Sequence, residues 1–123
     1  MGDITAHFSM AEFATRDGSP IPRNHQKEII ALCRSLLEPA RSVWGRAHIA
    51  SGYRSRDDNV RVGGVAGSFH MDRGRLRGAA ADVSFATGSP EEWYRTFDRL
   101  GAGGLGLYPT FVHVDNRRVH ARW

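Results

Sequence analysis

The chain has 123 residues, 41% of them hydrophobic, and a formal net charge of +4. This length suits one globular domain and is too short for two, so we expect a single domain over residues 1–123. The lone Cys33 excludes an intrachain disulfide framework. No apolar run reaches the length of a membrane span, so we expect no membrane insertion. We also expect a monomer.

The first residues carry neither the basic leader nor the apolar core of an export signal. We therefore expect synthesis in the cytoplasm. Further along, Ser9 and Glu12 form a capping-box pattern, which predicts a short helix over about Ser9 to Ala14.

A longer helix is expected next, with Asn24 as its N-cap and apolar residues recurring at helical spacing as far as Trp44. Pro39 should kink or divide this helix, and Gly45 should end it. Cys33 lies among its apolar positions and is interpreted as a small buried side chain.

The second half of the chain is expected to be rich in strands. A capping box at Ser89 and Glu92 predicts one helix from about Pro90 to Leu100. The expected strands are His48–Ser51, Leu105–Tyr108, Phe111–Asp115 and Val119–Trp123. Because helices come first and most strands come last, the sequence predicts an α+β fold in which a small antiparallel β-sheet packs with helices.

Two histidines and one aspartate are candidate metal ligands. Asp82 follows three alanines in a segment that is expected to be buried, where a carboxylate needs a partner. In the expected strand Phe111–Asp115, His113 and Asp115 point to one face and the valines to the other. His70, Asp82 and His113 together offer the ligand types of an open zinc site. Such a site lowers the pKa of its bound water molecule towards neutrality. The spacing alone also allows His70 to be a solvent-exposed loop histidine.

Several segments, in order, resemble one known family. They are Ser51-Gly52-Tyr53-Arg54-Ser55, Asn59, Val62-Gly63-Gly64, Ser68-Phe69-His70, Gly78-Ala79-Ala80-Ala81-Asp82, Gly104-Leu105-Gly106-Leu107-Tyr108-Pro109 and Phe111-Val112-His113-Val114-Asp115. The pattern is similar to the peptidase M15 family of zinc D-Ala-D-Ala carboxypeptidases and peptidoglycan endopeptidases, in particular to small phage-encoded members. The resemblance covers nearly the whole chain.

This resemblance implies a hedgehog-like fold, a peptidoglycan peptide as substrate and Zn²⁺ held by His70, Asp82 and His113. It also implies that Arg54 lies near the substrate carbonyl, where a cation stabilises the oxyanion of the tetrahedral intermediate. Ser68 and Tyr108 are expected to contact the substrate.

The chain departs from the family pattern in two places. The first histidine and the aspartate are closer together in most relatives, which implies an insertion over about Asp72 to Leu76, either a specificity loop or a surface loop. The second departure is at the general base, because Thr110 and Phe111 occupy the positions where relatives place a proton acceptor. Asp115 is the first substitute, either as the base or as a partner that orients a ligand imidazole. His120 and Asp72 are further candidates for the base.

The sequence therefore predicts a zinc metallopeptidase that hydrolyses amide bonds in peptidoglycan stem peptides. It would be made in a bacterial host and act on the wall after release or as part of a virion. A non-catalytic hedgehog-like zinc domain that binds the wall or a protein partner is the alternative. A nucleic-acid partner is not expected, because the arginines are scattered and no nucleic-acid-binding motif is present.

Overall fold

The computed structural model describes residues 2–65, 67–74 and 77–123. Its strands form a five-stranded sheet in the order β1-β2-β4-β3-β5. The strands are β1 (Ala47–Ser51), β2 (Ala80–Phe85), β3 (Gly104–Leu107), β4 (Val112–Asp115) and β5 (Ala121–Arg122). The expected α+β fold with a small sheet is confirmed.

Strand β5 departs from the antiparallel expectation. The pairs β1–β2, β2–β4 and β3–β4 are antiparallel, whereas β5 runs parallel to β3. Because β2 and β3 already occupy the two edges of β4, the returning chain pairs with the outer edge of β3. The strand is also shorter than the predicted Val119–Trp123, since only Ala121 and Arg122 enter the ladder.

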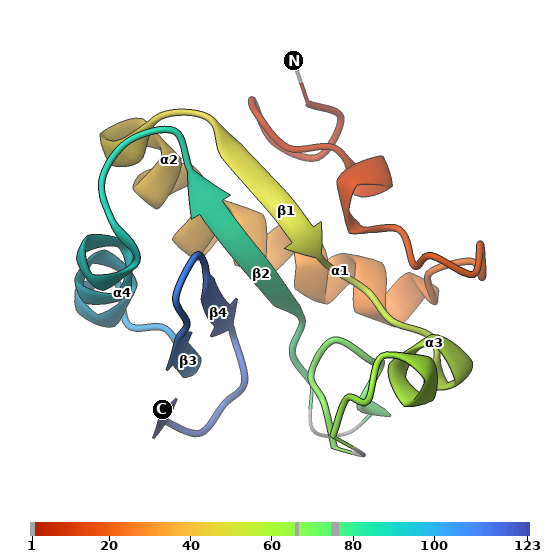
Figure 1. The fold of residues 1–123 in the computed structure, drawn as a ribbon. Coiled ribbons are helices and arrows are strands. Elements are labelled where there is room, and N and C mark those ends of the chain that lie inside the picture. The colour runs from red at the N-terminus through yellow and green to blue at the C-terminus, as the bar shows by residue number, and fades with distance from the viewer. Residues whose placement is uncertain (1, 66, 75–76) are drawn as a thin grey trace.

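The helices lie mainly on one face of the sheet. They are the 3₁₀ helix η1 (Met10–Phe13), α1 (Arg23–Leu32), the π-helical segment η2 (Cys33–Leu37), α2 (Glu38–Trp44), α3 (Arg56–Arg61) and α4 (Pro90–Arg99). In Figure 1, α1 crosses behind β1 and β2, and α4 lies beside β3. Alternate strand residues such as Val83 and Val114 point towards these helices and form the core with Ile29, Leu37 and Phe97.

The local signals for helix ends hold in two places and fail in one. Ser9 and Glu12 make the reciprocal capping box of η1, and the Ser89 hydroxyl accepts from the Glu92 backbone N–H at the start of α4. The N-cap prediction at Asn24 was wrong, because α1 already begins at Arg23. Pro22 precedes this helix and supplies extended backbone there, so the boundary lies before Asn24.

Pro39 divides the long helix as expected. It lies in the first turn of α2, directly after the π-helical turn η2, and the backbone stays helical through this boundary. Gly45 ends α2 with a φ of +85°. In the part of the chain that the structure describes, no helix is both long and apolar enough to cross a membrane.

The segment between His70 and β2 contains the insertion expected over Asp72 to Leu76. Within it, Asp72, Arg73 and Gly74 are described, whereas residues 75 and 76 lie outside the described residues. Arg73 lies over the Phe69 ring, with its guanidinium carbon 4.7 Å from the ring centroid. The described part of the insertion therefore packs beside the loop that carries His70.

Candidate metal centre

The three predicted ligands meet on the sheet face opposite the helices. Asp82 on β2 and His113 on β4 are direct partners in the antiparallel register, so their side chains project side by side. His70 reaches them from the loop after α3. One nitrogen or oxygen atom of each residue lies within 4.8 Å of the others, which brings two imidazoles and one carboxylate together.

His70 is held by the loop that follows β1. Its Nδ1–H donates to the Gly52 carbonyl oxygen at 2.7 Å, which leaves Nε2 free to face Asp82 Oδ1 at 3.2 Å. The Ser68 hydroxyl accepts from the His70 backbone N–H at 3.1 Å. This arrangement fixes both the position of the ring and the nitrogen that it presents to a metal.

His113 is held from the opposite side. Its Nε2–H donates to Asp115 Oδ2 at 2.7 Å, while Nδ1 lies 3.2 Å from Asp82 Oδ1. The two histidines thus present different nitrogens to the same carboxylate. In each ring the other nitrogen is bonded to a fixed acceptor, as is usual for metal-binding histidines.

Asp115 is fully buried and bonded at both oxygens. Besides His113, it accepts from the Gly104 backbone N–H at 2.7 Å and from the Arg117 guanidinium at 2.7 to 3.1 Å. Asp115 and Asp82 lie on opposite sides of the His113 ring. These contacts favour the orienting role over the base role, because a base must reach water on the Asp82 side.

The electrostatics of the cluster suit a cation. Burial alone would raise the pKa of Asp82, but hydrogen bonds from His113 and His70 outweigh it and hold this pKa well below its usual range. Burial lowers the pKa of His113, but its bonds to Asp115 and Asp82 raise it overall. A carboxylate that stays ionised between two imidazole rings forms a site with affinity for positive charge.

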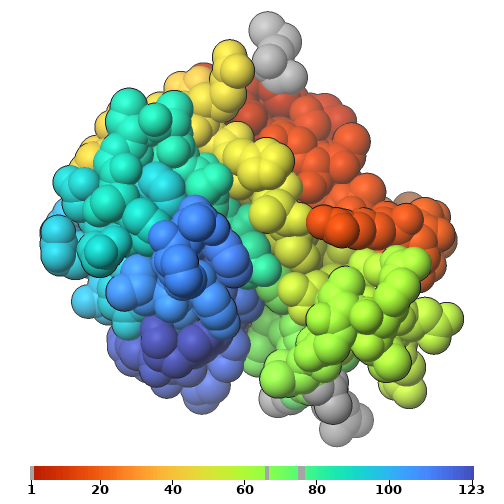
Figure 2. Space-filling view, viewed as in Figure 1, coloured from red at the N-terminus to blue at the C-terminus, as the bar shows by residue number. Residues whose placement is uncertain are grey.

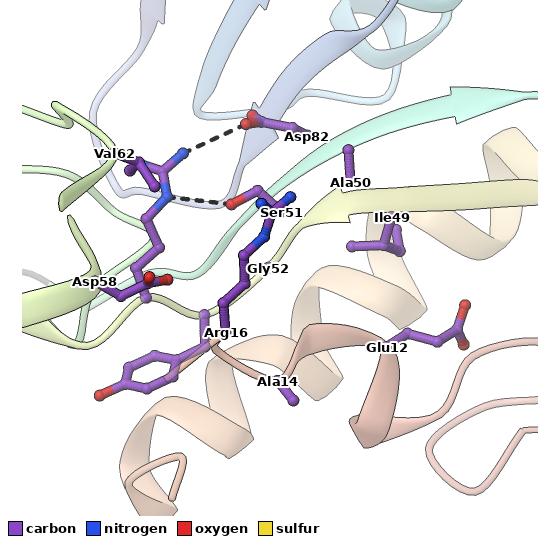
Figure 3. Close-up of a pocket in the computed structure, with 12 residues that line it drawn as sticks. Glu12, Ala14, Arg16, Ile49, Ala50, Ser51, Gly52, Asp58, Val62 and Asp82 are labelled. Atoms are coloured by element: carbon purple, nitrogen blue, oxygen red, sulfur yellow. Dashed lines mark hydrogen bonds and ion pairs between the residues drawn. The ribbon is translucent and has the colours of Figure 1, made fainter. Parts of the chain in front are cut away.

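Arg54 connects the two ligands nearest to it. Its backbone N–H donates to the His70 carbonyl at 2.8 Å, and its Nη2 lies 3.6 Å from Asp82 Oδ2. The Nε–H donates to Ser51 Oγ at 3.1 Å, so the guanidinium is fixed before any substrate arrives. Figure 3 shows Ser51 and Asp82 as the ends of the two dashed lines from this guanidinium.

Asn59 and Gly64 support Arg54 from the other side. Asn59 Oδ1 accepts from Arg54 Nη1 at 3.1 Å, and its amide donates to the Val65 carbonyl at 2.9 Å. A Cβ on Gly64 would lie 2.2 Å from Asn59 Oδ1, so only glycine allows this close approach. Asn59 and Gly64 of the sequence pattern thus have a structural role in holding Arg54 beside the metal ligands.

Aromatic side chains form one wall of a cleft beside the cluster. The rings of Tyr108 and Phe111 are stacked with centroids 4.7 Å apart, and the Trp123 indole N–H donates to the Tyr108 hydroxyl at 2.9 Å. Trp123 also lies against His113, with ring centroids 5.0 Å apart. The cleft measures about 610 Å³ and includes His70, Asp82 and His113 in its lining. Figure 2 shows a hollow between the blue C-terminal strands and the green α3 region.

The predicted substrate residues reach this cleft to different degrees. Arg54, Ser68 and Tyr108 all line it, but the Ser68 hydroxyl is already bonded to the His70 backbone. His120 and Asp72, the further candidates for the base, are exposed and do not line it.

Sequence reasoning missed Arg117. Its guanidinium is bonded to Asp115 and lies over the Phe69 ring at 4.4 Å and the Trp123 ring at 5.4 Å. The only signal for it was an arginine two positions after a strand-end aspartate, a pattern too common to single out a site residue.

A family model described as Peptidase M15 matches residues 6–115, which includes every ligand of the cluster. No curated protein and no solved structure shows significant similarity to the chain.

Proposed function

The chain belongs to the peptidase M15 family, and from this membership we propose that it is a zinc metallopeptidase that hydrolyses amide bonds in the peptide stems of peptidoglycan. The observation that carries the proposal is the His70, Asp82 and His113 cluster, with its ligand atoms within 4.8 Å of one another. Two imidazoles and one carboxylate are a donor set of catalytic zinc sites, which keep a further position for water or substrate.

The residues present fit such an ion. The outer nitrogens of His70 and His113 are bonded to Gly52 and Asp115, so both rings are held with a free nitrogen towards Asp82. A zinc ion bound there supplies Lewis acidity, which lowers the pKa of water and polarises an amide carbonyl. We propose zinc rather than another divalent metal because of the ligand types and the family.

Arg54 has the electrostatic part in the proposed reaction. Its guanidinium is fixed by Ser51 and Asn59 and lines the cleft beside Asp82. A cation held there in advance stabilises the negative charge that develops on the carbonyl oxygen when water adds to the amide. Asp115 holds His113 in place, whereas His120 and Asp72, the other candidates for the base, are exposed and do not line the cleft.

The wall and the cellular setting belong to the same proposal. Their support is the similarity of the chain's motifs to those of phage-encoded members and the net charge of +4, which favours approach to an anionic polymer. We place the action of the protein at the bacterial wall, after release from the host cytoplasm or as part of a virion. Ser68 and Tyr108 would contact the stem peptide in the cleft.

A second candidate is a zinc domain without catalysis that binds the wall or a protein partner. It is favoured by one observation: among the described residues that line the 610 Å³ cleft, Asp82 is the only carboxylate. Thr110 and Phe111, at the positions where relatives have a proton acceptor, supply none.

Mass spectrometry separates the two candidates. Zinc-loaded protein is incubated with purified peptidoglycan beside two variants, His70→Ala and His48→Ala, the latter at an exposed position on β1. Stem fragments that disappear with His70→Ala and persist with His48→Ala are expected for the peptidase. A protein that retains zinc but releases no fragments from several wall types supports the non-catalytic domain.

A further inference from the structure

A row of hydrogen bonds continues from the metal cluster to an arginine behind it. Asp82 Oδ1 lies 3.2 Å from Nδ1 of His113, and Asp115 Oδ2 accepts from the Nε2–H of the same ring at 2.7 Å. Both oxygens of Asp115 also accept from the Arg117 guanidinium, and Oδ1 accepts from the Arg117 backbone N–H at 3.0 Å. The proposed function gives a role to every member of this row except Arg117.

Asp115 depends on Arg117 for its charge balance. The Asp115 side chain is completely buried, whereas the Arg117 side chain keeps 19% of its surface exposed. A buried carboxylate is stable only when it is paired and its oxygens are bonded. Among the described residues, Arg117 is the only arginine or lysine that forms an ion pair with Asp115. Loss of the guanidinium would therefore leave this carboxylate underbonded in the protein interior.

Two aromatic rings hold the Arg117 guanidinium in place. Its central carbon lies 4.4 Å from the ring centroid of Phe69 and 5.4 Å from that of Trp123. Phe69 directly precedes His70 in the chain, and the Trp123 ring lies 5.0 Å from that of His113. A guanidinium can stack on rings with its faces while its edge bonds a carboxylate. Arg117 thus joins the surroundings of both histidine ligands.

The start of β3 leaves room for this ion pair. A Cβ on Gly104 would lie 2.6 Å from Arg117 Nε and closer still to Asp115 Oδ2. A Cβ on Gly103 would lie 2.8 Å from the Arg117 backbone nitrogen. Two consecutive positions of the chain therefore require glycine because the ion pair occupies the space where their side chains would be.

From these contacts we infer that Arg117 is a positioning residue of the metal site, which acts through Asp115 to hold the His113 ring with its Nδ1 towards the cluster. The inference rests on the proposed function and adds to it a residue outside the metal ligands and the cleft residues assigned above. Among the described residues, the Arg117 guanidinium donates hydrogen bonds to Asp115 alone. Its effect on a bound metal must therefore pass through that carboxylate.

Arg117→Lys is the variant that tests this role. Lysine keeps the positive charge, but its ammonium group cannot stack between two rings and bond both oxygens of Asp115 at once. Arg122→Lys is the matched control, because the Arg122 side chain is 18% exposed and bonds Asp98 and backbone carbonyls instead. Arg117→Gln, which keeps one N–H donor, takes the place of the lysine variant if that variant does not fold.

Zinc affinity and the visible absorption of bound Co²⁺ are the two measurements. We expect Arg117→Lys to lower the zinc affinity about tenfold, at the lower end of the loss that follows removal of an orienting partner. The Co²⁺ spectrum at saturating metal should also change, since it reports the geometry of the ligands. Arg122→Lys should match the wild type in both measurements, although both variants are expected to lower the stability of the fold.

A double-mutant cycle tests whether the effect passes through Asp115. In the Asp115→Asn background, Arg117→Lys should lower the zinc affinity no further, because the carboxylate that carries the effect is already absent. An additional loss as large as that in the wild-type background would show that Arg117 acts without Asp115, and it would overturn the inference.

Two other results overturn the inference and leave the proposed function intact. Wild-type affinity and an unchanged Co²⁺ spectrum in Arg117→Lys would show that Asp115 holds the ring without its arginine. Equal losses in Arg117→Lys and Arg122→Lys would assign the effect to general loosening of the C-terminal strands. A wild-type protein that binds neither Zn²⁺ nor Co²⁺ would overturn the inference and the proposed function together. Metal binding without hydrolysis of peptidoglycan would contradict the proposed peptidase alone, because neither measurement requires hydrolysis.

Discussion

His113 and Asp115, two positions apart on β4, are joined by a hydrogen bond of 2.7 Å on the side of the imidazole that faces away from Asp82. Because strand residues alternate, both side chains share one face, and the carboxylate can hold the ring from behind. This bond to the fully buried Asp115 fixes the His113 ring so that its Nδ1 faces Asp82.

Replacement of Asp115 by Asn should weaken zinc binding. The amide keeps the size of the side chain but removes the charge that orients His113, and loss of such a partner typically costs about 10- to 100-fold in metal affinity. Competition with a chromophoric chelator measures the affinity. Asp98→Asn is the control, because Asp98 is an exposed carboxylate that also bonds an arginine, Arg122. Equal affinities in the two variants would contradict the orienting role.

Replacement of Arg54 by Lys should lower the hydrolysis rate while zinc is retained. A lysine cannot reproduce the separate bonds to Ser51 and Asn59 that fix the guanidinium. Removal of one preorganised donor to an oxyanion costs about 100-fold or more in rate. Initial rates and metal content are measured on the same samples, with Arg56→Lys, at the exposed start of α3, as the control. If zinc is lost together with the rate, Arg54 acts through Asp82 rather than on the substrate.

Replacement of Gly64 by Ala should destabilise the protein and disturb Arg54. The added methyl group would lie 2.2 Å from Asn59 Oδ1 and 2.8 Å from Arg54 Nη1. Overpacking of this kind costs about 1 to 3 kcal/mol. Urea unfolding gives the stability, and Gly67→Ala is the control because its new Cβ would meet only the flexible tip of Arg73 at 3.3 Å. Similar stabilities for the two variants would show that the loop adjusts freely.

Acid should destabilise the fold through His25. Burial, reinforced by the charge of His70 and opposed by that of Asp72, lowers the pKa of His25 from 6.5 to about 4. Neither of its ring nitrogens has a hydrogen-bond partner among the described residues. Between pH 6.5 and 4 the unfolded chain binds the proton and the folded chain does not, so stability falls as the pH drops through this window. The loss reaches about 3 kcal/mol near pH 4.

His25→Leu should remove most of this pH dependence. Unfolding free energies from urea titrations at pH 7, 5.5 and 4, in the presence of a chelator, measure it. His48→Leu is the control, because His48 is exposed on β1 and should keep the wild-type slope. A wild-type slope in His25→Leu would show that other groups cause the acid sensitivity.

The fold class and the ends of several elements followed from local rules, because the capping boxes at Ser9 and Ser89 and the break at Pro39 depend on residues close in sequence. The pairing of β5 did not, since it depends on which strand edge is free after β2 and β3 have paired with β4. Helix α3 was not predicted either. It has only six residues, and its Ser55 cap, which accepts from the Asp58 N–H, has little apolar periodicity after it.

The candidate ligands were found through their resemblance to a motif, and the register explains why that motif works. Asp82 and His113 are 31 positions apart in sequence but are direct partners across two strands. The supporting groups were harder to find. Asp115 accepts hydrogen bonds from Gly104 and Arg117. These bonds depend on the positions of β3 and of the turn after β4 in the folded chain, which the sequence pattern does not give.

The three ligands come from a loop and two strands that only the folded chain brings together, and this has a thermodynamic consequence for the whole molecule. The unfolded chain lacks the assembled site, so the zinc of the proposed function would bind the native state preferentially and stabilise it by mass action. Free zinc at one hundred times its dissociation constant adds about 2.7 kcal/mol to the free energy of unfolding. If the proposed zinc peptidase is correct, the lifetime of the protein in a cell should follow the supply of zinc, and depletion of the ion should expose the chain to proteases as well as stop catalysis.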